Sequence, residues 1–179
     1  MTQLWLNPAD DPRVAADDEP LRGERAVLTN YLRHYRMTFE LKCQDLDAEQ
    51  LARRSVPPSA LSLLGLLRHL AKVEQSWCRR VMERQPELPR LFWSAEDPAL
   101  DFDGARADPE VVEEAWATWR TEVAHAKEVY GTLDLDVLGA HPDGELELRD
   151  VLVHLIEEYA RHCGHADLLR ECIDGRTGQ

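Results

Sequence analysis

The chain has 179 residues, of which 44% are hydrophobic and 31% charged, and its formal net charge is -13. This length and apolar content predict one folded domain and exclude global disorder, and no apolar run approaches the ~18 residues of a membrane span. The negative charge argues against nucleic acid or an anionic membrane as a partner, because both attract Lys and Arg. The first ten residues lack the basic and apolar segments of a secretion signal, so we expect a cytoplasmic protein with its four cysteines reduced.

The N-terminal part of the chain divides into an arm and the start of a helical domain. Residues 1–22 are rich in Asp and Pro and are expected to form an extended arm before a single domain at 23–179. A first helix is predicted over 23–44, because apolar side chains recur there at helical spacing. A short helical turn is expected in 45–55, before Pro57–Pro58 stops it.

The second predicted helix runs from an N-cap at Ser59 to Arg84, just before a proline. His69 borders its apolar face. The small residues within two turns of this histidine are Ser62, Gly65 and Ser76. A glycine inside a helix costs about 1 kcal/mol relative to alanine, so we interpret these small residues as leaving open space for a ligand.

The second half of the chain predicts two more long helices. A connection over 86–108 contains three prolines and is longer than usual, which indicates a functional or packing role. A third helix should start at Pro109 after its Asp108 cap and end by residue 131, and a fourth should run over 148–172. Strand-like alternation is nearly absent. The fold class predicted is therefore all-α, an antiparallel four-helix bundle with one long crossover.

The fourth helix carries a stripe of four polar, ligand-type side chains: His154, Glu158, His162 and His165. Their spacings of four, four and three place them on one side of a helix, and Glu158 and His162 lie in or beside its apolar face. An ionised carboxylate is rarely buried without a cationic partner. A metal ion is one candidate partner, and an ion pair with a neighbouring histidine is the alternative.

A bundle would bring the second and fourth helices face to face. His69, Glu158 and His162 would then offer two imidazoles and one carboxylate, which is a ligand set for one divalent metal ion with positions left for water or substrate. The alternative for each histidine is a hydrogen-bonded core residue. We therefore predict these three residues as metal ligands and keep core packing as the competing interpretation.

Two segments make the sequence similar to a known family. Residues 148–170, LRDVLVHLIEEYARHCGHADLLR, resemble the final helix of the DinB-like superfamily, and residues 67–74, LRHLAKVE, resemble its second helix. The resemblance covers the chain from about Gly23 onward. It implies a DinB/YfiT-like four-helix bundle that binds a metal ion and is often a homodimer. Many members of the superfamily use three histidines as ligands.

This sequence has Glu158 where many members have the first histidine of the last helix, and His162 matches the second. That variant resembles the branch that contains mycothiol-dependent maleylpyruvate isomerase and mycothiol S-transferases. The resemblance implies zinc, with nickel or iron as alternatives, and a low-molecular-weight thiol such as mycothiol as cosubstrate. The expected partners are thus a small-molecule thiol and an electrophilic substrate.

An open three-ligand site supports two kinds of chemistry. It can hold a thiol as thiolate for transfer to an electrophile, or it can acidify water for hydrolysis. We predict thiol S-transfer with His154 and His165 as catalytic or supporting groups, whereas the alternatives are a hydrolase and a non-catalytic metal-binding stress or interaction protein. Non-haem iron oxygenase chemistry fits the same ligands but not the resemblance. The cations available to hold an anionic thiol or substrate are Arg68, Lys72, Arg79 and Arg161.

Overall fold

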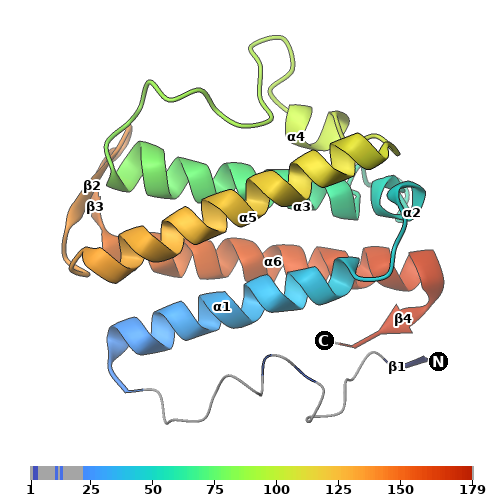
Figure 1. The fold of residues 1–179 in the computed structure, drawn as a ribbon, viewed down its shortest axis with the longest axis horizontal. Helices are drawn as coiled ribbons and strands as arrows, with labels where there is room; N and C mark the ends of the chain where they lie inside the picture. Colours follow the sequence, from blue (N-terminus) through green and yellow to red (C-terminus); the bar gives the residue numbers. More distant parts are fainter. Residues whose placement is uncertain (1, 4–10, 12, 14–21, 179) are drawn as a thin grey trace.

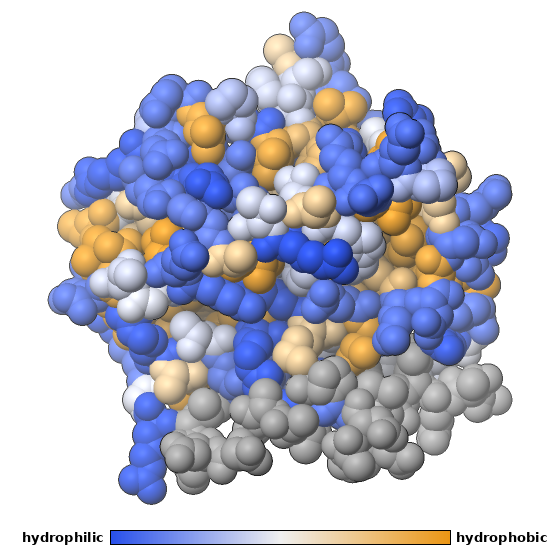
Figure 2. Space-filling model, in the orientation of Figure 1, coloured by the Kyte–Doolittle hydropathy of each residue, from blue (hydrophilic) through white to orange (hydrophobic). Residues whose placement is uncertain are grey.

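The computed structural model describes residues 2–3, 11, 13 and 22–178, and within them the protein is mostly helical (Figure 1). The arm predicted over 1–22 lies almost entirely outside these residues. None of the helices that are described is long and apolar enough to cross a membrane. The face drawn in Figure 2 is largely hydrophilic with scattered hydrophobic patches, as expected for a chain with 34 acidic residues.

Four long helical segments dominate the chain, and short elements connect them. The helices are α1 (Glu24–Cys43), α2 (Ala48–Ala52), α3 (Leu63–Gln75), the π-helix η1 (Ser76–Met82), α4 (Leu100–Asp103), α5 (Pro109–Thr132) and α6 (Leu148–Asp174). The strands are β1 (Thr2–Gln3), parallel to β4 (Arg176–Thr177), and β2 (Leu138–His141), antiparallel to β3 (Gly144–Glu147). η1 continues α3 directly, so the two together form the second long helical segment.

The long helices form two parallel pairs that run in opposite directions (Figure 1). α1 and α6 are neighbours that run the same way, since Glu24 pairs with Arg149 near their starts and Lys42 pairs with Asp167 near their ends. The α3–η1 segment and α5 also share one direction. The sequence analysis predicted an antiparallel four-helix bundle with one long crossover, and it did not anticipate these parallel neighbours. Their cause is the 86–108 crossover, which returns the chain to the end of the molecule where α3 begins.

Two local features differ from the sequence analysis. The second long helix begins at Leu63 rather than after Ser59, because Ser62 has the extended backbone of an N-cap and its Oγ accepts the Gly65 N–H at 3.1 Å. The chain also forms the β2–β3 hairpin, which the sequence analysis did not predict. Gly139 of β2 lies so close to η1 that a Cβ there would be 2.8 Å from the Met82 sulfur, and the hairpin therefore packs tightly on η1.

A buried polar network connects all four long helices. The Arg36 guanidinium of α1 donates to both carboxylate oxygens of Glu74 in α3, at 2.8 and 2.7 Å. The Tyr159 hydroxyl of α6 donates to Glu74 at 2.8 Å and accepts from the Trp119 indole of α5 at 2.8 Å. Glu74 and Tyr159 are both 0% exposed. One side chain from each long helix thus contributes to a single buried chain of hydrogen bonds.

Candidate metal centre

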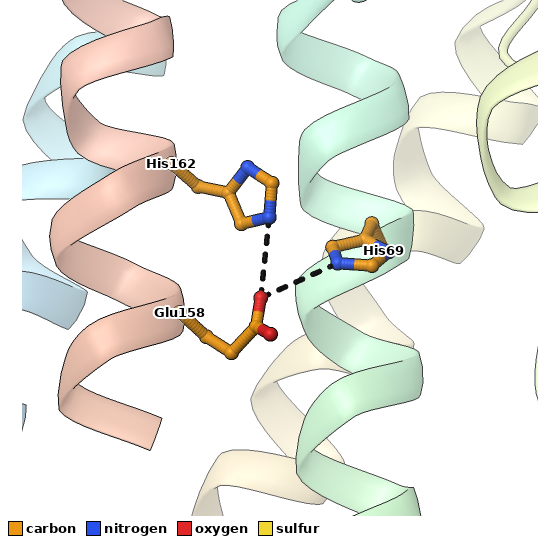
Figure 3. Close-up of side chains that lie close together, drawn as sticks. All are labelled: His69, Glu158 and His162. Atoms are coloured by element: carbon orange, nitrogen blue, oxygen red, sulfur yellow. Dashed lines mark ion pairs between the residues drawn. The ribbon is translucent and has the colours of Figure 1, made fainter. Parts of the chain in front are cut away.

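Three ligand-type side chains converge between α3 and α6 (Figure 3). Nε2 of His69 lies 3.6 Å from Oε2 of Glu158, and Nε2 of His162 lies 3.3 Å from the same oxygen. One ligand atom from each residue lies within 4.8 Å of those of the other two. The i,i+4 spacing of Glu158 and His162 places both on the face of α6 that meets α3. The structure thus brings together the three residues that the sequence analysis predicted as ligands.

A buried carboxylate that the sequence analysis missed supports His69. Nδ1 of His69 lies 2.9 Å from Oδ2 of Asp101 in α4, and the Lys72 ammonium lies 2.5 Å from the same oxygen. Asp101 is 1% exposed. Because Asp101 engages Nδ1, the Nε2 atom of His69 is directed at Glu158. The only signal in the sequence was the unusual length of the 86–108 connection, which did not identify this residue.

The other two histidines of α6 flank the cluster. Nδ1 of His165 lies 3.2 Å from Nδ1 of His162, on the ring edge opposite Glu158. Nε2 of His154 lies 3.4 Å from Oε1 of Glu158, the oxygen that does not face the other two imidazoles. The second ring nitrogen of His69 therefore lies beside Asp101, and that of His162 lies beside His165. The second carboxylate oxygen of Glu158 lies beside His154.

The electrostatics of the cluster favour positive charge beside Glu158. Hydrogen bonds from His162 and His69 hold the pKa of Glu158 well below its usual value, despite the opposing effect of burial. Burial lowers the pKa of His69, but the hydrogen bonds with Asp101 and Glu158 outweigh it and raise that pKa overall. Burial likewise raises the pKa of Asp101, yet His69 and Lys72 bring it below its usual value. The two carboxylates thus stabilise positive charge on His69, which lies between them.

The prediction of open space next to Gly65 was wrong. A Cβ on Gly65 would lie 3.2 Å from Cδ1 of Phe102, so the missing side chain makes room for α4 and not for a ligand. The Phe102 ring also stacks on His69, with centroids 5.1 Å apart and an interplanar angle of 25°. Gly65 therefore contributes to the site indirectly, because it allows the helix that carries Asp101 to pack against α3.

The donor set and its surroundings fit a divalent metal ion. Two imidazole nitrogens and one carboxylate oxygen are a ligand combination that catalytic zinc sites use, and non-haem iron sites use it as well. Metal-ligating histidines commonly donate their other ring N–H to a carboxylate, as the His69–Asp101 contact would allow. The ionised Glu158 supplies the negative charge that a bound cation needs.

Comparison with known families bears on what such a centre does. The family model of mycothiol S-transferases matches residues 27–175, which is most of the chain. The chain belongs to the mycothiol S-transferase family. This family is DinB-like, so the resemblance inferred from the two helical segments is confirmed. Comparison with curated proteins and with solved structures gave no match.

The four cations suggested as anion ligands have different surroundings in this mycothiol S-transferase family member. Arg68 donates to two backbone carbonyl oxygens of α4, at 3.0 Å each, and Arg79 pairs with Glu122 at 2.7 Å, so both have structural partners. Arg161 is exposed. Of the four, only Lys72 contacts Asp101, the residue that supports His69, and also lines a neighbouring cavity.

Proposed function

We propose that this protein is a metal-dependent thiol S-transferase on a DinB-like four-helix bundle, with His69, Glu158 and His162 as ligands of one divalent metal ion, zinc in the first place. The proposal rests on Oε2 of Glu158, which faces a ring nitrogen of both His69 and His162. The other ring nitrogen of His69 contacts Asp101, and that of His162 contacts His165. Membership of the mycothiol S-transferase family supports the reaction class. Mycothiol is accordingly the first thiol to test.

The residues of the centre determine how reactive a coordinated thiol would be. When bound, a divalent metal ion holds a thiol as thiolate at neutral pH. Two neutral imidazoles and the Glu158 carboxylate give a zinc site a formal charge of about +1, whereas three histidines would leave +2. The lower charge withdraws less electron density from sulfur. Glu158 therefore favours a thiolate that stays nucleophilic.

The transfer step is a substitution in which sulfur replaces the leaving group of the electrophile. Sulfur forms a bond to the electrophilic carbon, and the bond from that carbon to its leaving group breaks with both electrons going to the leaving group. The proton lost by the thiol passes to solvent. His154 can carry it, because its side chain is 36% exposed and lies beside Glu158. His165 acts as a positioning residue for His162, and Asp101 does the same for His69.

Conjugate formation tests the proposed function. Zinc-loaded protein is incubated with chlorobimane and with mycothiol, bacillithiol or glutathione, and bimane fluorescence is followed. We expect the fastest conjugation with mycothiol and a loss of the catalysed rate in Glu158→Ala. Rates equal to those of metal-free Glu158→Ala with every thiol would reject S-transfer for these substrates and favour hydrolysis or metal binding without turnover.

Asp101 gives a separate prediction about positioning. Asp101→Asn is expected to weaken zinc binding about 10- to 100-fold, which is the usual effect of losing a hydrogen-bonded carboxylate behind a ligating histidine. It should also lower the pKa of His69 in the metal-free protein, because the carboxylate raises that pKa. Chelator competition measures the first effect, and histidine NMR titration measures the second.

Asp103→Asn is the matched control, since Asp103 lies in the same short helix but has a 53% exposed side chain paired with Arg54. Zinc affinity in this variant should equal that of the parent protein. An Asp101→Asn protein with unchanged zinc affinity and an unchanged His69 pKa would show that Asp101 only packs.

We also propose a cytoplasmic location, a homodimer and no nucleic-acid partner. A cytoplasmic location and a homodimer agree with the DinB-like resemblance, and a net charge of -13 opposes nucleic acid as a partner. Light scattering of the purified protein measures the oligomer, and a monomer at micromolar concentration would exclude the homodimer.

A further inference from the structure

A cavity of about 350 Å³ lies beside the candidate metal centre, between η1, the 86–108 crossover and the β2–β3 turn. Its charged and aromatic lining consists of Lys72, Trp77, Arg80, Arg90, Trp93 and His141. This volume is at the lower end of the range for small-molecule sites. The cavity is therefore large enough for a small planar molecule.

The lining of the cavity is cationic in a strongly acidic chain. No Asp or Glu of the described residues lines it, although the chain has 34 of them. Arg80 donates to the backbone carbonyl oxygen of Leu88, and the Arg90 guanidinium lies over the Trp93 ring, 5.6 Å from its centroid. Within residues 22–178 neither arginine forms an ion pair. Two positive charges thus remain available to an anion.

Aromatic rings and the π-helix η1 line the same cavity. The Trp77 ring stacks on His141 with centroids 5.3 Å apart and an interplanar angle of 6°. Trp77 and Arg80 both belong to η1, where the Glu83 N–H closes the last turn on the Cys78 carbonyl oxygen, five residues earlier, at 3.0 Å. Such π-helical turns are rare and occur frequently at functional sites.

Two contacts connect the cavity to the metal centre. On one side, the Trp77 ring lies against His154, with centroids 4.4 Å apart, and His154 in turn faces Glu158. On the other side, Lys72 pairs with Asp101, which holds His69. Two side chains therefore lie between the cavity and the nearest ligand residue on each side.

We propose that this cavity binds the carboxylate of a planar, anionic electrophile, which is the substrate class of the transferase. The inference rests on the proposed function for its reaction but not for its binding test. Arginines recognise carboxylates through paired hydrogen bonds, and the tryptophans provide faces for a planar group. We assign the anion to the electrophile because the proposed function places the thiol at the metal centre and not in this cavity.

Calorimetry with the metal-free protein tests the cavity apart from the metal centre. The probes are trans-cinnamate and its neutral counterpart cinnamamide. We expect cinnamate to bind at least about tenfold more tightly, because only the carboxylate engages the arginines. Arg90→Gln and the double variant Arg80→Gln/Arg90→Gln should each weaken cinnamate binding, the double variant by about tenfold or more. Arg53→Gln, an exposed arginine in the α2–α3 connection, is the matched control and should bind cinnamate like the parent.

Three results would overturn the proposal: no cinnamate binding, equal affinity for cinnamamide, or unchanged affinity in the double variant with its circular dichroism intact. Displacement of cinnamate by S-methyl mycothiol would also overturn it, since the cavity would then belong to the thiol. The binding test uses metal-free protein, so a failure of thiol transfer would not affect its result. Conversely, a failure of cinnamate binding would not contradict thiol transfer to chlorobimane, which is neutral.

Discussion

Glu158→Ala is expected to weaken zinc binding by roughly 100- to 1000-fold. Zinc binding contributes about 10–16 kcal/mol in zinc-finger peptides, and an equal share among three protein ligands and one water would be about 2.5–4 kcal/mol. The loss should be larger than that of a neutral ligand, because Glu158 also supplies the negative charge among the three ligands. Elemental analysis after gel filtration and competition with a chromogenic chelator measure the occupancy and the affinity.

The neighbouring residue provides the control for this prediction. Glu157 lies next to Glu158 on α6, but its side chain is 64% exposed, so Glu157→Ala should keep its zinc. His154→Ala should also bind most of its zinc, because His154 lies beside Oε1 of Glu158 and not beside the Oε2 atom that faces His69 and His162. If His154→Ala loses the metal and Glu158→Ala retains it, the helical register of the proposed ligands is wrong.

Arg36→Met is expected to lower the free energy of unfolding by about 3–5 kcal/mol. Glu74 is 0% exposed, and removal of Arg36 would leave its carboxylate buried without a cation. Circular dichroism melts should show the midpoint falling by roughly 6–20 °C, given about 2–4 °C per kcal/mol for a domain of this size.

The double variant Arg36→Met/Glu74→Leu isolates the cause. Replacing both partners of a buried ion pair by apolar side chains removes the uncompensated charge, so this variant should be more stable than Arg36→Met alone. Tyr159 then lacks its acceptor, which limits the recovery. A midpoint for Arg36→Met within 2 °C of the parent would show that water or another group compensates Glu74.

Helical periodicity made much of the fold predictable. The predicted helices over 23–44 and 148–172 match α1 and α6 within two residues at each end. Their apolar stripes and end signals are local properties of the sequence, and tertiary packing did not override them. The spacing of Glu158 and His162 is equally local, and their convergence with His69 was anticipated because a bundle brings the second and fourth helices face to face.

The features that escaped prediction depend on contacts distant in sequence. Asp101 is one of many acidic residues in the chain, and only the packing of α4 against α3 places it on His69. Gly65 was interpreted as a sign of open space. The residue that fills this space, Phe102, is 37 positions away in the sequence, so the contact could not be foreseen. The π-helical turn and the β2–β3 hairpin depend on packing against each other, as the close approach of Gly139 to Met82 indicates.

The ion pair between Lys72 and Asp101 has a consequence for how two ligands would influence each other. Lys72 lines the cavity, and Asp101 contacts His69, so one ammonium group is shared by two binding events. An anion that draws Lys72 toward the cavity would leave Asp101 more strongly engaged with His69. By thermodynamic linkage, the same factor must apply in both directions, so zinc would change anion affinity as much as the anion changes zinc affinity. Lys72 would then couple the occupancy of the metal centre to that of the cavity.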